Sequence, residues 1–224
     1  MSIGYFLALE GIEGSGKTTQ IDRLADLIRT SGRNVVLTKE PGGTPLGNRI
    51  RAILLDPQEE GMDALTELFL YAASRRQHVV ELIRPALERG AVVLCDRYTD
   101  ATLAYQGFGR QLELERLRNL NDWVTEGTYP DLTLIFDLQE SLGLQRARTR
   151  NDTSELLQGE SRIEGEDLRF HRRVREGYLA LAEAEPERYE VIEAGGSPDD
   201  VYSAMIDTLA RRAPQLGIGA SQQT

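Results

Sequence analysis

The chain has 224 residues, of which 40% are hydrophobic and 28% charged, and its formal net charge at pH 7 is −10. That length and apolar content suffice for one α/β domain with a sizeable core. So acidic a chain lacks the basic stripe needed to wrap a nucleic-acid backbone, but a local cluster of Arg and Lys could still bind a small anion.

Two further features concern the compartment. Cys95 is the only cysteine, so the chain can form no internal disulfide and offers no second cysteine at metal-ligand spacing. Residues 1–9 are apolar but short and lack a basic lead, which is typical of a strand rather than a secretory signal. No apolar run approaches the roughly 20 residues that span a bilayer. We therefore expect a cytoplasmic protein without a membrane partner.

The first half of the chain alternates between short apolar runs, which predict buried strands, and longer stretches with apolar residues three and four apart, which predict helices. Glycine and proline mark the breaks between them. In chain order we expect a strand at 5–10, a helix from Lys17 to 31–32, a strand at 34–38, a loop at 40–43, a helix at about 46–54, a helix at 64–89 bent near Pro85, and a strand at 91–95.

The second half continues the alternation. In chain order we expect a helix at 112–126, a strand at 132–138, helices at 142–150 and 163–185 joined by a polar link at 151–161, a strand at 189–192, a helix with Ser197 as N-cap and Pro198 in its first position, and a flexible tail at 214–224. Strands that alternate with helices and are apolar on both faces are typical of a parallel sheet covered on both sides.

Residues 11–18 read Gly-Ile-Glu-Gly-Ser-Gly-Lys-Thr and match the P-loop pattern G-x-x-x-x-G-K-[ST], between a predicted strand and a predicted helix. The glycines let backbone amides turn inward onto phosphates, and the helix points its amino-terminal dipole at the same anion. Lys17 would reach the β- and γ-phosphates, and the Thr18 hydroxyl would hold Mg²⁺. The predicted ATP-binding residues are Gly11, Ile12, Glu13, Gly14, Ser15, Gly16, Lys17 and Thr18.

Asp96 ends the apolar run 92–95. The carboxyl ends of parallel strands are where open α/β sheets bind ligands. We predict that Asp96, together with Thr18, orders Mg²⁺ or its water shell. The alternative is that Asp96 only caps the segment that follows.

The P-loop by itself does not separate a kinase from a GTPase switch or an ATPase motor. The chain has no Asn-Lys-x-Asp guanine motif, and Glu10 precedes the loop where a partition-type ATPase carries Lys. Arg97 adjoins Asp96 at a strand end, and Arg51 and Arg75 lie on flanking segments, which favours a second phosphate-bearing substrate. For any single surface Arg, the alternative is an ordinary solvated charge.

Basic residues on both sides of the polar link 151–161 are consistent with a lid. Such a lid could close over ATP, expel water and bring positive charge to the transferring phosphoryl group. An exposed helix end with ordinary salt bridges fits the same residues. They are Arg146, Arg148, Arg150 and Arg162.

Several segments coincide with the motifs of one family. They are 9–19, with the P-loop, 38–44, with Glu-Pro-Gly-Gly-Thr, and 71–75, 96–98, 104–107 and 130–133, with Asp-Arg-Tyr and Ala-Tyr-Gln-Gly among them. Together they resemble bacterial thymidylate kinases, members of the nucleoside monophosphate kinase group, nearly end to end. The P-loop is shared by many families, whereas the two later motifs in combination are far more specific.

This resemblance implies a P-loop three-layer fold in a single domain at residues 1–213. The fold would hold a five-stranded parallel sheet with helices on both faces and a small lid at about 147–162. The implied reaction moves the γ-phosphoryl group of ATP to dTMP with the help of Mg²⁺. The resemblance also implies a homodimer.

The resemblance places four residues at the thymine base. Tyr71 would stack under the ring, although a Tyr on a long helix could equally belong to the core. Arg75 would donate to the thymine 4-carbonyl, with Thr102 and Gln106 at the base edge. A pocket shaped around the 5-methyl group would favour thymine over uracil only modestly.

It places five more at the rest of the acceptor. Lys39, Arg51 and Arg97 would clamp the monophosphate. Glu13 would approach the deoxyribose 3′-hydroxyl, and Tyr105 would form the wall against a ribose 2′-hydroxyl. Lys39 stands where many relatives have Arg, which loses the bidentate geometry.

The resemblance also indicates which residues would supply positive charge to the transition state. Relatives with an Arg inside the P-loop lean less on the lid; this chain has Gly14 there, so Arg148 and Arg150 would supply the charge. Ala101 replaces the usual Ser in the acceptor pocket, and the long link leaves the register of the lid open. The implied catalytic residues are Lys17, Arg97, Arg148, Arg150 and Glu13.

Two other hypotheses fit the same sequence. One is another small P-loop kinase that acts on a different nucleotide or on a deoxynucleoside. The other is a non-transferring ATP-binding switch, which would hydrolyse ATP without an acceptor.

Overall fold

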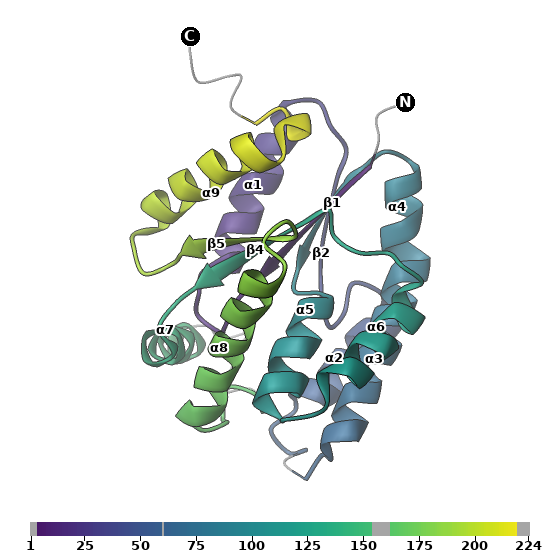
Figure 1. The fold of residues 1–224 in the computed structure, drawn as a ribbon, viewed down its shortest axis with the longest axis vertical. Coiled ribbons are helices and arrows are strands. Elements are labelled where there is room, and N and C mark those ends of the chain that lie inside the picture. The colour runs from purple at the N-terminus through teal and green to yellow at the C-terminus, as the bar shows by residue number, and fades with distance from the viewer. Residues whose placement is uncertain (1–3, 60, 154–161, 219–224) are drawn as a thin grey trace.

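The sheet is parallel and has five strands in the order β2-β3-β1-β4-β5 (Figure 1). A computed structural model describes residues 4–59, 61–153 and 162–218. The predicted fold class is confirmed. The strands are β1 (Tyr5–Glu10), β2 (Val35–Lys39), β3 (Val92–Asp96), β4 (Leu132–Asp137) and β5 (Tyr189–Glu193).

The register of the sheet brings the carboxyl ends of β1, β2 and β3 together. Asp96, the last residue of β3, pairs with Leu9 of β1 on one side and with Lys39 of β2 on the other. Because the strands are parallel, the segments that leave them emerge at one edge of the sheet. The P-loop and the segments after β2 and β3 therefore lie next to one another.

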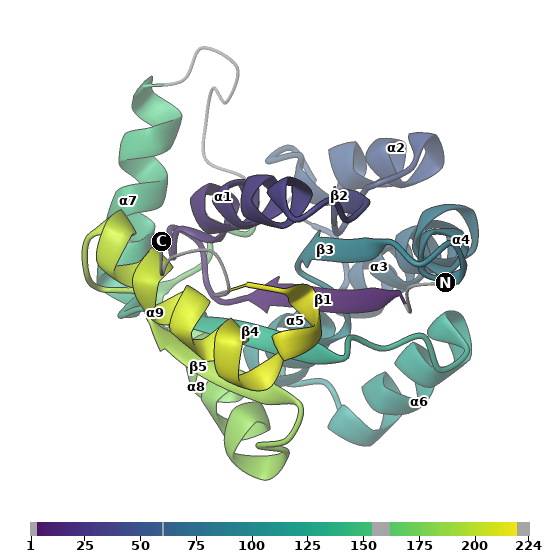
Figure 2. The ribbon, with the colours of Figure 1, turned by 90° about the horizontal axis from the view of Figure 1, so that it is seen from above.

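Helices cover both faces of the sheet (Figure 2). α1 and α9 contact each other on one face, while α8 and η2 contact each other on the opposite face. The helices are α1 (Lys17–Thr30), α2 (Pro45–Leu55), α3 (Ala64–His78), α4 (Arg84–Glu88), α5 (Thr99–Thr102), α6 (Leu114–Thr125), α7 (Glu140–Thr153), α8 (Leu168–Ala184) and α9 (Pro198–Arg212), with π-helical η1 (Val79–Ile83) and η2 (Leu103–Gly109) and the 3-10 helix η3 (Pro214–Leu216).

The central strands are buried on both sides, as their apolar sequences predict. All six residues of β1 are buried, and five of them are apolar. A strand with no exposed face can present function only at its end. The one polar residue of β1, Glu10, lies at that end.

Capping residues set where several helices begin. Ser197 and Asp200 form a capping box at the start of α9, and Pro198 occupies its first turn, as predicted. The helix expected from 163 begins only at Leu168, because the Asp167 side chain accepts a hydrogen bond from the Phe170 amide. The residues just before Asp167 form turns instead.

The long helix expected at 64–89 is continuous but changes its winding. It passes from α3 through the π-helical η1 into α4, with Pro85 in the first turn of α4. Proline has no amide hydrogen and clashes with the carbonyl four residues earlier, so a wider turn before Pro85 accommodates it. The interruption lies where the sequence places it.

The sequence analysis predicts no element between the strand at 91–95 and the helix at 112–126. Residues 99–109 are helical, although Gly107 and Gly109 disfavour a helix. Tertiary packing overrides that preference: a Cβ at Gly109 would lie 2.6 Å from the Phe170 ring, so helix α8 fits only against glycine.

The expected tail at 214–224 begins too early by five residues. Leu216 and Ile218 are buried in the main core, with 0% and 7% exposure. The apolar side chains hold residues 214–218 against the domain, and residues 219–224 lie outside the described residues.

In the described part of the chain, no helix combines the length and apolarity that a membrane crossing demands.

Candidate active site

A cleft of about 580 Å³ opens at the carboxyl edge of the sheet, a size suited to small-molecule ligands. The P-loop forms one wall, and the segments after β2 and β3 form the others. Six basic and four acidic side chains line it, so the cleft is locally positive in an acidic protein. The basic residues are Lys17, Lys39, Arg51, Arg75, Arg97 and Arg146.

The P-loop adopts its turn because its glycines permit positive φ. Gly14 has φ +71° and Gly16, the N-cap of α1, has φ +88°. A Cβ at Gly14 would lie only 2.1 Å from the carbonyl oxygen of Gly143 in α7. Gly14 is therefore required by close backbone packing, and a larger residue such as Arg would have to displace α7.

Lys17 folds back over the loop. Its Nζ donates to the carbonyls of Gly11 and Ile12, at 2.9 Å each, and to Ser15 Oγ at 3.1 Å. Burial, with a smaller contribution from Arg97, lowers the pKa of Lys17 to about 8. The ammonium is thus held in the cleft, and phosphate oxygens there would compete with the loop carbonyls for it.

Thr18 and Asp96 face each other across the cleft. The Thr18 hydroxyl donates to Asp96 Oδ2 at 3.3 Å, and α5 takes Tyr98 as its N-cap without any side-chain cap. Asp96 therefore does not serve as a helix cap here. Two adjacent hard oxygen ligands fit Mg²⁺, which takes few protein ligands and completes its shell with water and phosphate. Accordingly, the described residues hold no cluster of three metal-binding side chains.

Arg97 is the centre of the acceptor side of the cleft. Its backbone has φ +69°, uncommon for a residue with a Cβ and a frequent mark of functional sites. Its Nη2 donates to Glu13 Oε1 at 2.9 Å, and its Nη1 donates to the Tyr178 hydroxyl at 3.2 Å. The guanidinium also lies 4.8 Å from the ring centroid of Tyr105. It is thus held in one place.

Glu13 is kept ionised by its neighbours. It also accepts a hydrogen bond of 2.7 Å from the Tyr105 hydroxyl. Burial favours a higher pKa for Glu13, but Arg97, His171 and Tyr105 outweigh it and hold the pKa well below its ordinary value. The buried His171 lies with Nδ1 3.5 Å from Glu13 Oε2, although neither atom has a hydrogen-bond partner among the described residues.

The predicted base-binding residues converge on one end of the cleft. Arg75 is 1% exposed and donates to Thr102 Oγ1 at 2.8 Å, while Gln106 donates to Glu67 Oε1 at 2.7 Å. Tyr71 is half-buried and lines the cleft, so it does not belong to the core. All four line the same cleft.

The other predicted cations border the same cleft. Lys39 is exposed at the end of β2, and Arg51 in α2 donates to the Pro41 carbonyl at 3.0 Å. Ala101, which replaces a usual Ser, lines the cleft too, and its amide donates to Glu10 Oε1 at 3.2 Å. Its segment is therefore held by the backbone rather than by a hydroxyl.

The predicted lid arginines separate into different environments. Arg146 lines the cleft and donates to the carbonyls of Ala194 and Gly195. Arg148 is exposed on α7 and is not among the residues that line the cleft, while the side chain of Arg150 and most of the link 151–161 lie outside the described residues.

The sequence left Arg162 open between a lid residue and an exposed salt bridge, and its environment in the structure is neither. It is 9% exposed, donates to the Leu54 carbonyl at 3.1 Å and pairs with the buried carboxylate of Glu67 at 2.5 Å. A buried charge requires such a partner. Arg162 instead ties the segment before α8 to α2 and α3.

Three buried carboxylates support the site, and sequence reasoning missed their roles. Glu10 accepts hydrogen bonds from the Tyr98 amide and the Tyr178 hydroxyl, each at 2.7 Å, and burial followed by the nearby Asp100 raises its pKa to about 7. Glu40 pairs with Arg75 of the cleft, whereas Glu67 pairs with Arg110 and Arg162 and accepts a hydrogen bond from Gln106 of the cleft. An acid at the end of a wholly apolar strand was the available signal for Glu10; for Glu67, in an amphipathic helix, there was none.

Comparison with known proteins gives a consistent result. The sequence model of a family described as thymidylate kinase matches residues 9–205. A thymidylate kinase of Desulfovibrio desulfuricans is 55% identical over 94% of this chain and 99% of its own length, and one of Geobacter sulfurreducens is 50% identical over 95% and 100%. The crystal structure of thymidylate kinase from Ehrlichia chaffeensis superposes with a TM-score of 0.73 at 36% identity, covering 92% of this chain and 99% of that one.

Proposed function

The chain belongs to the thymidylate kinase family, and from that premise we propose that it moves the γ-phosphoryl group of ATP onto dTMP in the cleft described above, giving dTDP and ADP. The observation that carries the proposal is the continuity of the cleft. It joins the P-loop, which suits a nucleoside triphosphate, to a pocket with several cations and an aromatic side chain, which suits a nucleoside monophosphate.

The chemistry would consist of positioning and charge neutralisation. Phosphoryl transfer needs little covalent participation by the protein, so it depends on in-line placement and electrostatic stabilisation. Lys17 would neutralise charge on the transferring group, while Lys39, Arg51 and Arg97 would hold the acceptor phosphate opposite it. The ion pair between Arg97 and Glu13, at 2.9 Å, would link the phosphate clamp to the sugar.

The base and sugar would be recognised by the remaining lining residues. Tyr71 would stack on thymine, and Arg75 with Thr102 and Gln106 would bind its polar edge. Glu13 would accept from the 3′-hydroxyl, and Tyr105 would close the space next to the 2′-carbon. Their common location in one cleft supports these roles.

Mg²⁺ is part of the proposal. Thr18 and Asp96 would hold the ion or its water shell, and the ion would neutralise phosphate charge. The 3.3 Å distance between Thr18 Oγ1 and Asp96 Oδ2 supports the binding of one ion by both side chains.

We expect dTMP to be the best acceptor by a wide margin. A site built to hydrogen-bond particular polar groups of a base rejects bases that lack them by roughly 10³-fold or more, whereas the missing methyl of dUMP costs only about 10- to 100-fold. ADP release measured with dTMP, dUMP, dCMP, AMP and thymidine tests this. Equal turnover of all acceptors would leave another small kinase as the better assignment, and ATP hydrolysis without any acceptor would favour the switch.

The domain and lid form a second part of the proposal. The predicted kinase domain, residues 1–213, would extend to residue 218, with a lid at about 147–161 whose arginines, Arg148 and Arg150, complete the transition state. α7 supports this because its Gly143 packs directly on the P-loop and its far end carries both arginines. A movement of α7 would therefore displace the P-loop that binds the phosphates.

Replacing both Arg148 and Arg150 with Ala should lower kcat by roughly 10²-fold and leave the affinity for ATP nearly unchanged, because charge at the transferring group acts mainly in the transition state. Single-turnover kinetics and equilibrium binding of an ATP analogue measure the two quantities. Arg116→Ala, at an exposed arginine of α6, controls for the loss of surface charge. An unaltered kcat would remove the lid from the mechanism.

A cytoplasmic homodimer completes the proposal. α3 and η1 carry an exposed row of Leu65, Phe69 and Val80, which are 50%, 60% and 46% exposed. Large exposed apolar side chains gathered on one helix are typical of a protein interface. A monomeric mass in sedimentation equilibrium at micromolar concentration would contradict the dimer.

The use of ATP and the free, buried Cys95 support a location in the cytoplasm.

A further inference from the structure

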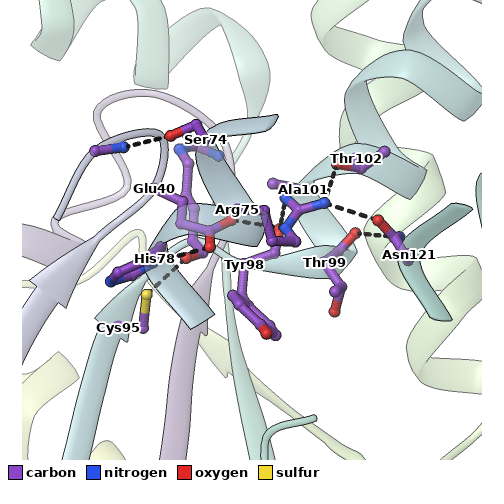
Figure 3. A network of polar contacts seen from close by, with 12 residues as sticks. Glu40, Ser74, Arg75, His78, Cys95, Tyr98, Thr99, Ala101, Thr102 and Asn121 are labelled. Carbon is purple, nitrogen blue, oxygen red and sulfur yellow. Dashed lines mark hydrogen bonds and ion pairs between the residues drawn. The ribbon is translucent and has the colours of Figure 1, made fainter. Parts of the chain in front are cut away.

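One turn of α3 binds the loop at residues 40–44 through Ser74, Arg75 and His78, of which only Arg75 lines the cleft (Figure 3). Ser74 Oγ accepts from the Gly42 amide at 3.1 Å. Arg75 Nε donates to Glu40 Oε2 at 2.7 Å, and His78 Nδ1 lies 2.9 Å from Glu40 Oε1. The Glu40 carboxylate is therefore shared between an arginine and a histidine of the same helix.

The side chains of this network are almost completely buried. Glu40 is 4% exposed, and His78 is completely buried. A buried carboxylate is stable only when both oxygens have partners, so each of the two contacts is needed. An ionised carboxylate only accepts hydrogen bonds, which assigns the hydrogen between His78 and Glu40 to Nδ1.

His78 is itself held at its other nitrogen. Nε2 lies 2.7 Å from Oγ1 of Thr38, the residue before the last in β2. The loop also packs on the imidazole ring: a Cβ at Gly43, where φ is +77°, would lie 2.5 Å from Nε2. The ring thus has no freedom to rotate, and it fixes the position of Glu40.

The other end of the network is the guanidinium of Arg75. Its Nη1 donates to Thr102 Oγ1 at 2.8 Å and to Asn121 Oδ1 at 2.7 Å, and its Nη2 donates to the Tyr98 carbonyl at 2.9 Å. Arginine has five N–H donors. With the Glu40 bond, four are used by described residues, and the fifth, on Nη2, is the one that remains for a ligand in the cleft.

The direction of that last donor depends on Glu40. The guanidinium is planar and rigid, so four fixed donors determine the line of the fifth. The same loop also holds Arg51, whose Nη1 donates to the Pro41 carbonyl at 3.0 Å. A displacement of the loop would therefore move the base-reading arginine and the phosphate-binding arginine together.

We propose that His78 is a positioning residue for the acceptor: by holding Glu40 against Arg75 and supporting the loop at Gly43, it aims the free donor of Arg75 at the base. The proposal rests on the proposed function, in which Arg75 binds the thymine edge. His78 does not line the cleft and touches no reacting group, so its effect passes through Arg75.

The test compares steady-state constants of four variants with those of the parent protein. His78→Phe keeps the shape of the ring and removes both polar contacts. His78→Asn places an amide nitrogen near the position of Nδ1 and can restore the bond to Glu40. Thr38→Val removes only the hydroxyl that orients the ring. Val79→Ala, at the next and equally buried residue of the helix, is a matched control that does not touch Glu40.

We expect His78→Phe to raise KM for dTMP roughly tenfold or more. The hydrogen bond from the charged Arg75 to the base would be misplaced both in the substrate complex and in the transition state. Its kcat and KM for ATP should change less than about threefold. His78→Asn should recover most of the affinity, and Thr38→Val should show a smaller rise in KM. Val79→Ala should lower Tm and leave KM for dTMP unchanged, since packing loss alone reduces stability.

A double-mutant cycle with Arg75→Ala decides whether the effect passes through Arg75. If it does, His78→Phe and Thr38→Val will add nothing to the KM of Arg75→Ala. Additive effects, or a lower kcat with unchanged KM in both His78→Phe and Thr38→Val, would overturn the proposal and leave His78 a stability residue. Should His78→Phe fail to fold, Thr38→Val in the two backgrounds gives the same decision.

Failure of the underlying function would look different. A parent protein that does not phosphorylate dTMP, or an Arg75→Ala variant with normal KM for dTMP, would contradict the assignment of Arg75. A parent and Arg75→Ala that behave as proposed, combined with unaffected KM in the His78 and Thr38 variants, would contradict the inference on His78 alone.

Discussion

Exchange of Lys17 for methionine is expected to lower kcat by roughly 10²- to 10³-fold, the usual cost of removing one preorganised donor from a developing negative charge. Methionine matches the length and apolar stem of lysine, so the change removes the ammonium and little else. The ammonium is held by the Gly11 and Ile12 carbonyls, at 2.9 Å each. It therefore needs no reorganisation from solvent when phosphate takes their place.

The kinetic pattern distinguishes this role from a general loss of structure. KM for dTMP should stay within about threefold, because the acceptor contacts lie on the other side of the cleft and lose nothing. Arg29→Ala is the control for charge, since it removes a basic, exposed residue from the far end of the same helix. Steady-state ADP release and thermal unfolding of the three proteins provide the comparison. A normal kcat in Lys17→Met would exclude the P-loop from catalysis.

Exchange of Arg97 for alanine should reduce kcat/KM for dTMP by roughly 10²- to 10³-fold, because it removes one partner of a nearly buried ion pair and the main cation opposite the P-loop. The Glu13 carboxylate would keep its bond to Tyr105 but lose its charge partner. KM for ATP should change little. A non-transferring ATP switch predicts the contrary result, with hydrolysis of ATP unaffected by the substitution.

The strained backbone at Arg97 needs its own control. At φ +69°, alanine retains the unfavourable Cβ, whereas glycine relieves it. Arg97→Gly should therefore be more stable than Arg97→Ala by about 1 kcal/mol and equally inactive. Recovery of activity in the glycine variant would assign the defect to the backbone rather than to the guanidinium. Arg97→Lys, which keeps charge but not the fork, should fall between the parent and alanine.

The local parts of the site follow from the sequence because their causes are local. The P-loop needs glycines at positive φ between a buried strand and a helix, and all three features lie within residues 5–30. The cap at Ser197 and the break before Pro85 are equally short in range. The five-stranded parallel sheet follows from the alternation of apolar runs with amphipathic helices.

Packing between distant segments decided what these patterns could not. The helix at 99–109 forms despite its glycines because side chains of α6 and α8 pack closely against Gly107 and Gly109. Residues 214–218 join the core because the apolar side chains of Leu216 and Ile218 find space there. A tail rich in glycine and polar residues gives no local sign of such a site.

Charge pairing was the least predictable part of the site. The sequence by itself determined the fold class and the P-loop, and it predicted a set of candidate cations for a phosphate-binding cleft. Only the tertiary structure decided which of them face the cleft: Arg162 pairs with Glu67 across 95 residues, and Arg75 with Glu40 across 35. The reason is physical, since a buried charge must find its counter-ion in space, and spatial neighbours of this kind leave no periodic trace along the chain.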